Sequence, residues 1–524
     1  MTTKENNTIK VASLMMIITL IGKILGLVRD QFLAGNYAFG MEASAFLTAS
    51  RIPRIFFDAI FASAISASFI PVFTEYLQKK GKDEAFKLSS NFITIIAVFT
   101  SIIALLGITF APQLTMFFAD GFDAETAALC TELLKIMFLA TVFTGIAFSF
   151  VGILQSMEEF NVPAAMSIAS NAVIIGYYIF FNEQFGIYGL TIAFLLGWGM
   201  QALIQIPSLI KKGYRYRPVF NIKDEGIVKI FALMLPVMVS TWIQPINLAI
   251  NTKFASRLLE GAGVSAIEYA NTVYSIIVGV FVLSIVNVIF PKLARLTTNN
   301  KEQEFNKTIS ETTETMMFFL IPMTVGLMCV SVPMISVIYE RGVFGSYETQ
   351  ITASALFYFS IGMLGFGMQN VLSRAFYAKQ DGKMPLISGV FSIATNIILC
   401  IILSPRMGVS GLALASAISS IVSAVVLIIP MQKKNKLFSK IFFKEILKMA
   451  GAALVMSVSV LAVYYGLDML TASLSSFVGS GITLIVSVVV GGKIYIVVSK
   501  ILRINQCNLM FNMVNDFLKR KVER

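Results

Sequence analysis

The chain has 524 residues, of which 56% are hydrophobic and only 13% are charged. Apolar stretches of about 20 residues recur along nearly its whole length, which is typical of transmembrane helices and not of a soluble core. The stretches are continuous and do not alternate, so the pattern argues against an outer-membrane β-barrel. We therefore predict an all-α polytopic membrane protein.

The formal net charge of +12 lies mainly in short loops between the apolar stretches. This placement indicates the positive-inside bias of membrane proteins, and we expect no nucleic-acid partner. The absence of histidine excludes His-based acid–base catalysis and His-ligated metals. The cysteines are far apart and form no CxxC pair, so we predict no zinc site, no disulfide framework and no cofactor. They are Cys130, Cys329, Cys400 and Cys507.

In chain order the apolar stretches predict fourteen spans. Alternate loops are rich in lysine and arginine, whereas the loops between them carry almost none apart from Arg341 and Arg406. We expect the basic loops and both termini to face the cytoplasm. The predicted spans are 9–28, 44–73, 88–110, 132–155, 163–181, 186–210, 228–256, 267–290, 313–339, 350–376, 384–403, 408–430, 446–466 and 475–499.

An internal repeat organises these spans. The run Ser167–Asn171 recurs as Ser392–Asn396, and Gly186–Leu190 recurs as Gly408–Leu412. These and three proline matches keep an offset of about 220 residues and the same direction in the membrane. A common offset in a fixed order predicts a duplicated unit of six spans.

The repeat predicts an N-terminal lobe at residues 1–215, a C-terminal lobe at 216–436 and two extra helices with a tail at 437–524. Because six is even, both copies have the same orientation, and their symmetry axis runs along the membrane normal. Repeats of this kind place the substrate site at the interface between the lobes.

Several cations lie within membrane-length apolar stretches, where each costs roughly 2.5–3.5 kcal/mol at a helix centre. Each therefore needs a partner or a wet cavity. The repeat relates Lys23 to Lys253, which favours a cavity lined by both. We expect six cations to bind the substrate: Lys23, Arg29, Arg51, Arg54, Lys253 and Arg257.

Structural roles remain open for four of these cations, including Lys23, which could instead reach the membrane interface. Arg29 could reach the outer interface or pair with Asp58, and Arg54 could pair with Asp58 at a spacing of four residues. Arg257 lies near the predicted outer end of its span, where it could be an interfacial anchor.

The excess of intramembrane cations over acids predicts an anionic ligand: a carboxylate, a phosphate or a pyrophosphate. Arginine suits phosphate through its planar fork of donors. An exporter of cationic drugs would instead need buried acids. A membrane-embedded enzyme would need acids or histidine and large outer loops, so we predict that the chain is not an enzyme.

An ordered set of short motifs resembles the MurJ/MviN family of lipid II flippases, within the multidrug/oligosaccharidyl-lipid/polysaccharide exporter superfamily. The motifs run from about residue 10 to 440. They are Gly26–Asp30, Ala45–Phe46 with Arg51–Pro53, Ala67–Pro71, Tyr269–Ala270, Glu340–Phe344, and Ala375–Ala378 with Gln380–Asp381.

This resemblance implies a V-shaped bundle in the bacterial cytoplasmic membrane. A cationic central cavity would move undecaprenyl-pyrophosphate-linked lipid II from the inner to the outer leaflet by alternating access, with the lipid tail in a groove reaching the last two spans. Membrane lipids and cell-wall synthesis proteins would be its partners. The family's cavity cations map onto Lys23, where arginine is usual, and onto Arg29.

The chain departs from the family pattern at three positions. Ser44 stands where an acid is common, and Phe57 and Thr272 stand where arginines are expected. Arg54, with Lys253 or Arg257, could supply the missing charge. The departures leave open an alternative substrate, another polyprenyl-linked oligosaccharide of surface polysaccharide synthesis.

Overall fold

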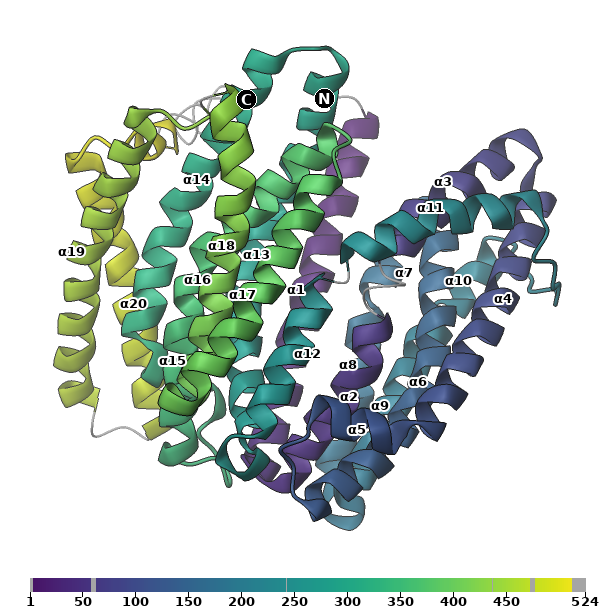
Figure 1. Ribbon diagram of the computed structural model, residues 1–524, viewed down its shortest axis with the longest axis horizontal. Coiled ribbons are helices and arrows are strands. Elements are labelled where there is room, and N and C mark those ends of the chain that lie inside the picture. Colours follow the sequence, from purple (N-terminus) through teal and green to yellow (C-terminus); the bar gives the residue numbers. More distant parts are fainter. Residues whose placement is uncertain (1–2, 58–62, 242, 436, 472–475, 511–524) are drawn as a thin grey trace. The chain divides into compact units, whose positions relative to one another are not determined.

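The computed structural model describes residues 3–57, 63–241, 243–435, 437–471 and 476–510. Every regular element among these residues is helical (Figure 1), as the sequence predicts. Eleven of the described helices are long and apolar enough to cross a membrane. The chain is therefore an all-helical, multi-pass membrane protein.

These eleven helices coincide with eleven of the fourteen predicted spans. The first predicted span lies in α1 (Thr3–Tyr37), which is 35 residues long. The second lies over α2 (Met41–Phe57) and α3 (Ser63–Lys79), and the seventh over α11 (Glu225–Thr241) and α12 (Ile243–Ser256). Residues 58–62 and 242, between these helices, lie outside the described residues.

Contacts among helices divide the chain into two units, Met1–Ser265 and Ala266–Arg524. Within the first unit, α11 packs on α3, and α12 packs on α2 and α5. The lobe boundaries derived from the repeat stay a prediction. The other helices of the first unit are α4 (Lys82–Thr109), α5 (Ala111–Phe118), α6 (Ala124–Ser156), α7 (Asn161–Ala164), α8 (Met166–Phe180), α9 (Asn182–Leu203), α10 (Ile206–Lys211) and the 3-10 turn η2 (Leu259–Gly261).

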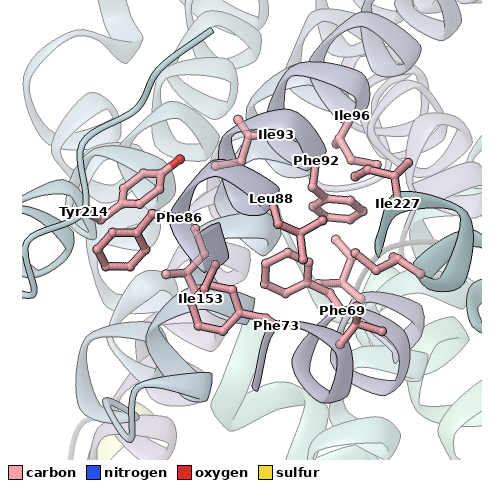
Figure 2. Close-up of a cluster of buried hydrophobic side chains, with 14 of the residues drawn as sticks. Phe69, Phe73, Phe86, Leu88, Phe92, Ile93, Ile96, Ile153, Tyr214 and Ile227 are labelled. Carbon is pink, nitrogen blue, oxygen red and sulfur yellow. The ribbon is translucent and has the colours of Figure 1, made fainter. Parts of the chain in front are cut away.

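A cluster of buried aromatic and aliphatic side chains joins α3, α4 and the linker before α11 (Figure 2). Phe69 of α3 contacts Phe92 of α4 with ring centroids 4.8 Å apart. Tyr214 of the linker packs edge-on against Phe86, and its hydroxyl hydrogen-bonds Ser90 at 3.1 Å. The linker is thereby fixed to α4, which sets where α11 begins.

An ion pair fastens α11 to α3. Lys229 of α11 pairs with Glu75 of α3, which also pairs with Lys79 at 2.9 Å. The hydrogen bond from Lys229, followed by that from Lys79, lowers the pKa of Glu75 from 4.5 to about 2.

We expect Glu75→Gln to destabilise the protein slightly at pH 7 but not near pH 2. A carboxyl whose pKa is lower in the folded state stabilises that state above its unfolded pKa, here about 4.5, and loses the contribution as the pH falls toward 2. Thermal unfolding of the wild type and the variant in detergent measures the difference. A difference that persists unchanged at the lowest pH would contradict the pairing.

The second unit is built mainly from long helices that lie side by side (Figure 1). The central helix α16 packs on both α14 and α18, and α19 and α20 pack against one another and against α14. Tyr495 of α20 donates a hydrogen bond to the Phe318 carbonyl of α14 at 2.8 Å. These helices are α13 (Gly263–Thr298), α14 (Glu302–Cys329), α15 (Ser331–Tyr339), α16 (Ser346–Ala378), α17 (Lys383–Met407), α18 (Val409–Asn435), α19 (Lys440–Thr471) and α20 (Ser476–Ile501).

The two copies of the repeated motif adopt the same backbone conformation. Gly186 has φ 51° and ψ −143°, and Gly408 has φ 56° and ψ −133°. Residues other than glycine rarely adopt such a backbone conformation. Asn171 and Asn396, which end the other repeated run, are both buried. Shared geometry at these positions supports the predicted duplication.

Gly365→Ala is expected to destabilise the second unit by about 1–3 kcal/mol, because it overpacks the contact between α16 and α18. A Cβ on Gly365 would lie 2.5 Å from the Ile421 backbone nitrogen, which cannot yield as a flexible side chain could. Thermal unfolding in detergent should show a lower midpoint. Gly176→Ala in α8 is the matched control, since its Cβ would meet nothing within 4 Å. Equal midpoints for the two variants would contradict the close approach.

Candidate functional site

Lys23 lies in the middle of α1, half-buried, and forms no hydrogen bond or ion pair with any residue that the structure describes. Its neighbour Gly22 faces α8, where an added Cβ would lie 2.1 Å from Ser167 Oγ. Asn171 of α8 donates a hydrogen bond to the Gly22 carbonyl at 3.2 Å. The glycine face of α1 is thus occupied by α8, and Lys23 projects about 100° away from it around the helix.

Arg29 is held on three sides. Its Nε and Nη2 donate to Asp30 Oδ1 at 2.9 and 2.7 Å, and Nη1 donates to Asn171 Oδ1 at 3.2 Å. The guanidinium also lies over the Phe194 ring, 5.2 Å from its centroid. The alternative partner considered from the sequence, Asp58, lies outside the described residues. Asp30 and Asn171 therefore fix the guanidinium in one orientation.

Arg51 of α2 reaches toward α12, where its Nη1 donates to Thr252 Oγ1 at 3.4 Å. Ser44, at the other end of α2, hydrogen-bonds Ser265 at 3.0 Å and is buried. Arg54 is exposed on the surface of α2. The predicted Arg54 pair with Asp58 again falls on a residue outside the described chain.

Lys253 and Arg257 meet at one carboxylate. Arg257 donates from Nε and Nη2 to the two oxygens of Asp120 at 2.8 and 2.6 Å. Lys253 Nζ lies 3.2 Å from Asp120 Oδ2 and donates to the Phe117 carbonyl at 2.8 Å. The Arg257 hydrogen bond, with a smaller contribution from Lys253, holds the pKa of Asp120 below its ordinary value, so the carboxylate is ionised at neutral pH.

The structure thus brings together two of the predicted cations on Asp120 and places the others on α1 and α2. Sequence reasoning did not select Asn171, Thr252 or Asp120 as site residues. The repeated run Ser167–Asn171 was a usable signal for Asn171, because a duplicated polar residue within an apolar stretch needs a buried partner.

The chemistry offered by these side chains is anion binding. Guanidinium and ammonium groups donate charge-assisted hydrogen bonds, which are about twice as strong as neutral ones. No group of three or more Cys, Asp or Glu side chains within the described part of the chain could hold a metal ion. The arrangement can therefore orient a phosphate-bearing molecule.

Sequence comparison gives relatives over most of the chain. The family model described as lipid II flippase MurJ matches residues 36–481. A probable lipid II flippase MurJ from Vibrio cholerae is 29% identical over 501 residues, which cover 92% of this chain and 95% of the relative. The one from Haemophilus influenzae is 30% identical over 83% of this chain and 89% of its own.

Comparison with solved structures agrees with the sequence similarity to lipid II flippases. A lipid II flippase MurJ in an inward closed conformation has a TM-score of 0.78 at 27% identity, covering 93% of this chain and 98% of that one. An inward-facing multidrug transporter of the MATE family shares the fold, with a TM-score of 0.65 at 16% identity over 81% of this chain and 98% of its own. The chain belongs to the lipid II flippase MurJ family, whose members are transporters and not enzymes.

Proposed function

We propose that this chain moves lipid II, the undecaprenyl-pyrophosphate-linked peptidoglycan precursor, from the inner to the outer leaflet. Family membership supports this substrate. The structural observation that carries the proposal is Lys23, a half-buried cation in the middle of a long helix with no described partner. A pyrophosphate would supply the missing negative charge and offset the cost of placing a lysine there.

The predicted site residues take distinct roles in this proposal. Lys23 receives the pyrophosphate, and Arg29 adds a preoriented fork of donors, since Asp30 and Asn171 fix its guanidinium. Arg51 contributes a further cation from α2, and the exposed Arg54 adds general positive potential. The remaining two cations, Lys253 and Arg257, act at the outer end of α12.

We place the protein in the bacterial cytoplasmic membrane with both termini in the cytoplasm. Segments assigned to the same side contact each other, and the excess of lysine and arginine in one set of loops favours that set for the cytoplasm. On the outer side, Tyr37 donates to Asn182 at 2.8 Å. On the inner side, Lys212 donates to the Met157 carbonyl at 3.0 Å. Membrane lipids and cell-wall synthesis proteins would be partners at these surfaces.

A second candidate substrate is another polyprenyl-linked oligosaccharide of surface polysaccharide synthesis. Ser44 favours it, because the serine replaces a common family acid and is buried in a neutral hydrogen bond with Ser265. The same cations would bind its pyrophosphate, so the two candidates differ only in the glycan.

Depletion of this protein in its native bacterium should separate the candidates. Cell lysis with lipid II accumulating in the inner leaflet, reversed by re-expression of the chain, is the expected result. Normal wall synthesis with loss of surface polysaccharide would favour the second candidate and contradict the first.

A further inference from the structure

The loop between α5 and α6 closes directly onto the outer end of α12. The Gly121 N–H donates to Ser256 Oγ at 3.2 Å, and Lys253 Nζ donates to the Phe117 carbonyl at 2.8 Å. A Cβ on Gly121 would lie 2.4 Å from Arg257 Cα, so the loop backbone touches the end of the helix. None of these contacts uses an acidic side chain, and they remain available if Asp120 loses its charge.

The Asp120 carboxylate is an anion already seated on the two cations. It presents two oxygens to the Nε–Nη2 edge of Arg257 at 2.8 and 2.6 Å, the bidentate geometry by which arginine also binds phosphate. Lys253 stands 3.2 Å from the second oxygen. One carboxylate on two cations leaves a net positive charge, which favours a more highly charged anion.

All three side chains are accessible from water. The exposed fractions are 29% for Asp120, 31% for Lys253 and 50% for Arg257. Ion pairs of this exposure contribute little to stability, because solvent screens them. A pyrophosphate can therefore displace the carboxylate, and the carboxylate, tethered beside the cations, can displace the pyrophosphate in turn.

We propose that Asp120 is a positioning residue that exchanges with the pyrophosphate of the substrate for Lys253 and Arg257, and thereby promotes release at the outer side. This inference rests on the proposed function. The cations transfer from Asp120 to the arriving pyrophosphate, and Asp120 recovers them as the lipid departs. The exchange makes and breaks only ion pairs and hydrogen bonds.

The test compares Asp120→Asn with the wild-type full chain, using lipid II as the probe. The asparagine keeps the shape of the side chain and removes its charge. We expect lipid II to bind roughly fivefold more tightly, since a competing exposed ion pair is lost, and to dissociate more slowly. Flipping in liposomes should fall accordingly. Asp120→Glu, which restores the charge, should behave as the wild type.

Glu125→Gln is the matched control, because Glu125 is an exposed acid in the first turn of α6, five residues away, and touches neither cation. If Asp120→Asn does not fold, Asp120→Ser carries the same change of charge. Failure of both neutral variants to fold would show that the Asp120 charge is needed for folding and would overturn the proposal. Unchanged or weaker lipid II binding by a folded variant would also overturn it.

The measurements distinguish failure of the proposed lipid II flipping from failure of the Asp120 exchange. A wild-type chain that neither binds nor flips lipid II contradicts the proposed function and removes the basis of the exchange. A wild-type chain that does both, with Asp120→Asn behaving like Glu125→Gln, contradicts the exchange alone.

Discussion

Lys23→Ala is expected to reduce lipid II flipping by about a hundredfold, which corresponds to losing a charge-assisted contact of roughly 3 kcal/mol. The reason is that Lys23 lies half-buried in α1 without a described partner, so its charge is available to the substrate. Complementation of a MurJ-depleted bacterium, with the amount of protein in the membrane measured alongside, provides the readout. Lys23→Arg should complement, because the charge remains and arginine is usual at this position in the family.

Lys493→Ala is the matched control for this change. Lys493 lies inside the membrane-length helix α20, but its side chain is exposed on the surface of the second unit. Removing it deletes a membrane-embedded cation outside the proposed site, and complementation should persist. If Lys23→Ala and Lys493→Ala complement equally well, Lys23 does not bind the substrate.

Arg29→Lys is expected to lower flipping by about tenfold even though the charge is kept. The guanidinium bonds Asp30 through two nitrogens and Asn171 through a third, and it lies over Phe194. An ammonium cannot occupy these positions together, so the remaining donors lose their orientation. Arg29→Ala should remove complementation entirely.

The control for Arg29 is Arg406→Lys, at an exposed arginine in the last turn of α17. Its activity should equal that of the wild type. Asn171→Ala tests the orientation directly: it leaves the Arg29 charge in place, and we expect it to weaken flipping in the same direction as Arg29→Lys. Wild-type activity for both Arg29→Lys and Asn171→Ala would show that orientation of this guanidinium is unimportant.

Continuous apolar runs sufficed to predict eleven membrane helices, because run length alone distinguishes a span from a soluble helix. Pro53 and Pro71 each lie inside a helix, in α2 and α3 respectively. Neighbouring helices can satisfy the backbone groups that a proline frees, so a proline within an apolar run does not by itself end a helix.

The candidate site was only partly predictable for a different reason. Cations within apolar stretches are conspicuous in a sequence, so the six proposed binding residues could be selected from it. Their partners were not, since Asp120 lies in a polar loop 137 residues before Arg257, and no local spacing links them. Asn171 is likewise 142 residues from Arg29, although its repeated motif was visible. Tertiary packing alone decides which acid or amide a cation meets.

The leaflet in which lipid II resides is the most direct measurement. In a MurJ-depleted bacterium that expresses this chain, lipid II should become accessible to a hydrolase added outside the cells. Lys23→Ala, at equal amounts in the membrane, should leave lipid II protected. Lipid II that stays protected despite the wild-type chain, or that becomes equally accessible with Lys23→Ala, would contradict flipping through this cationic site.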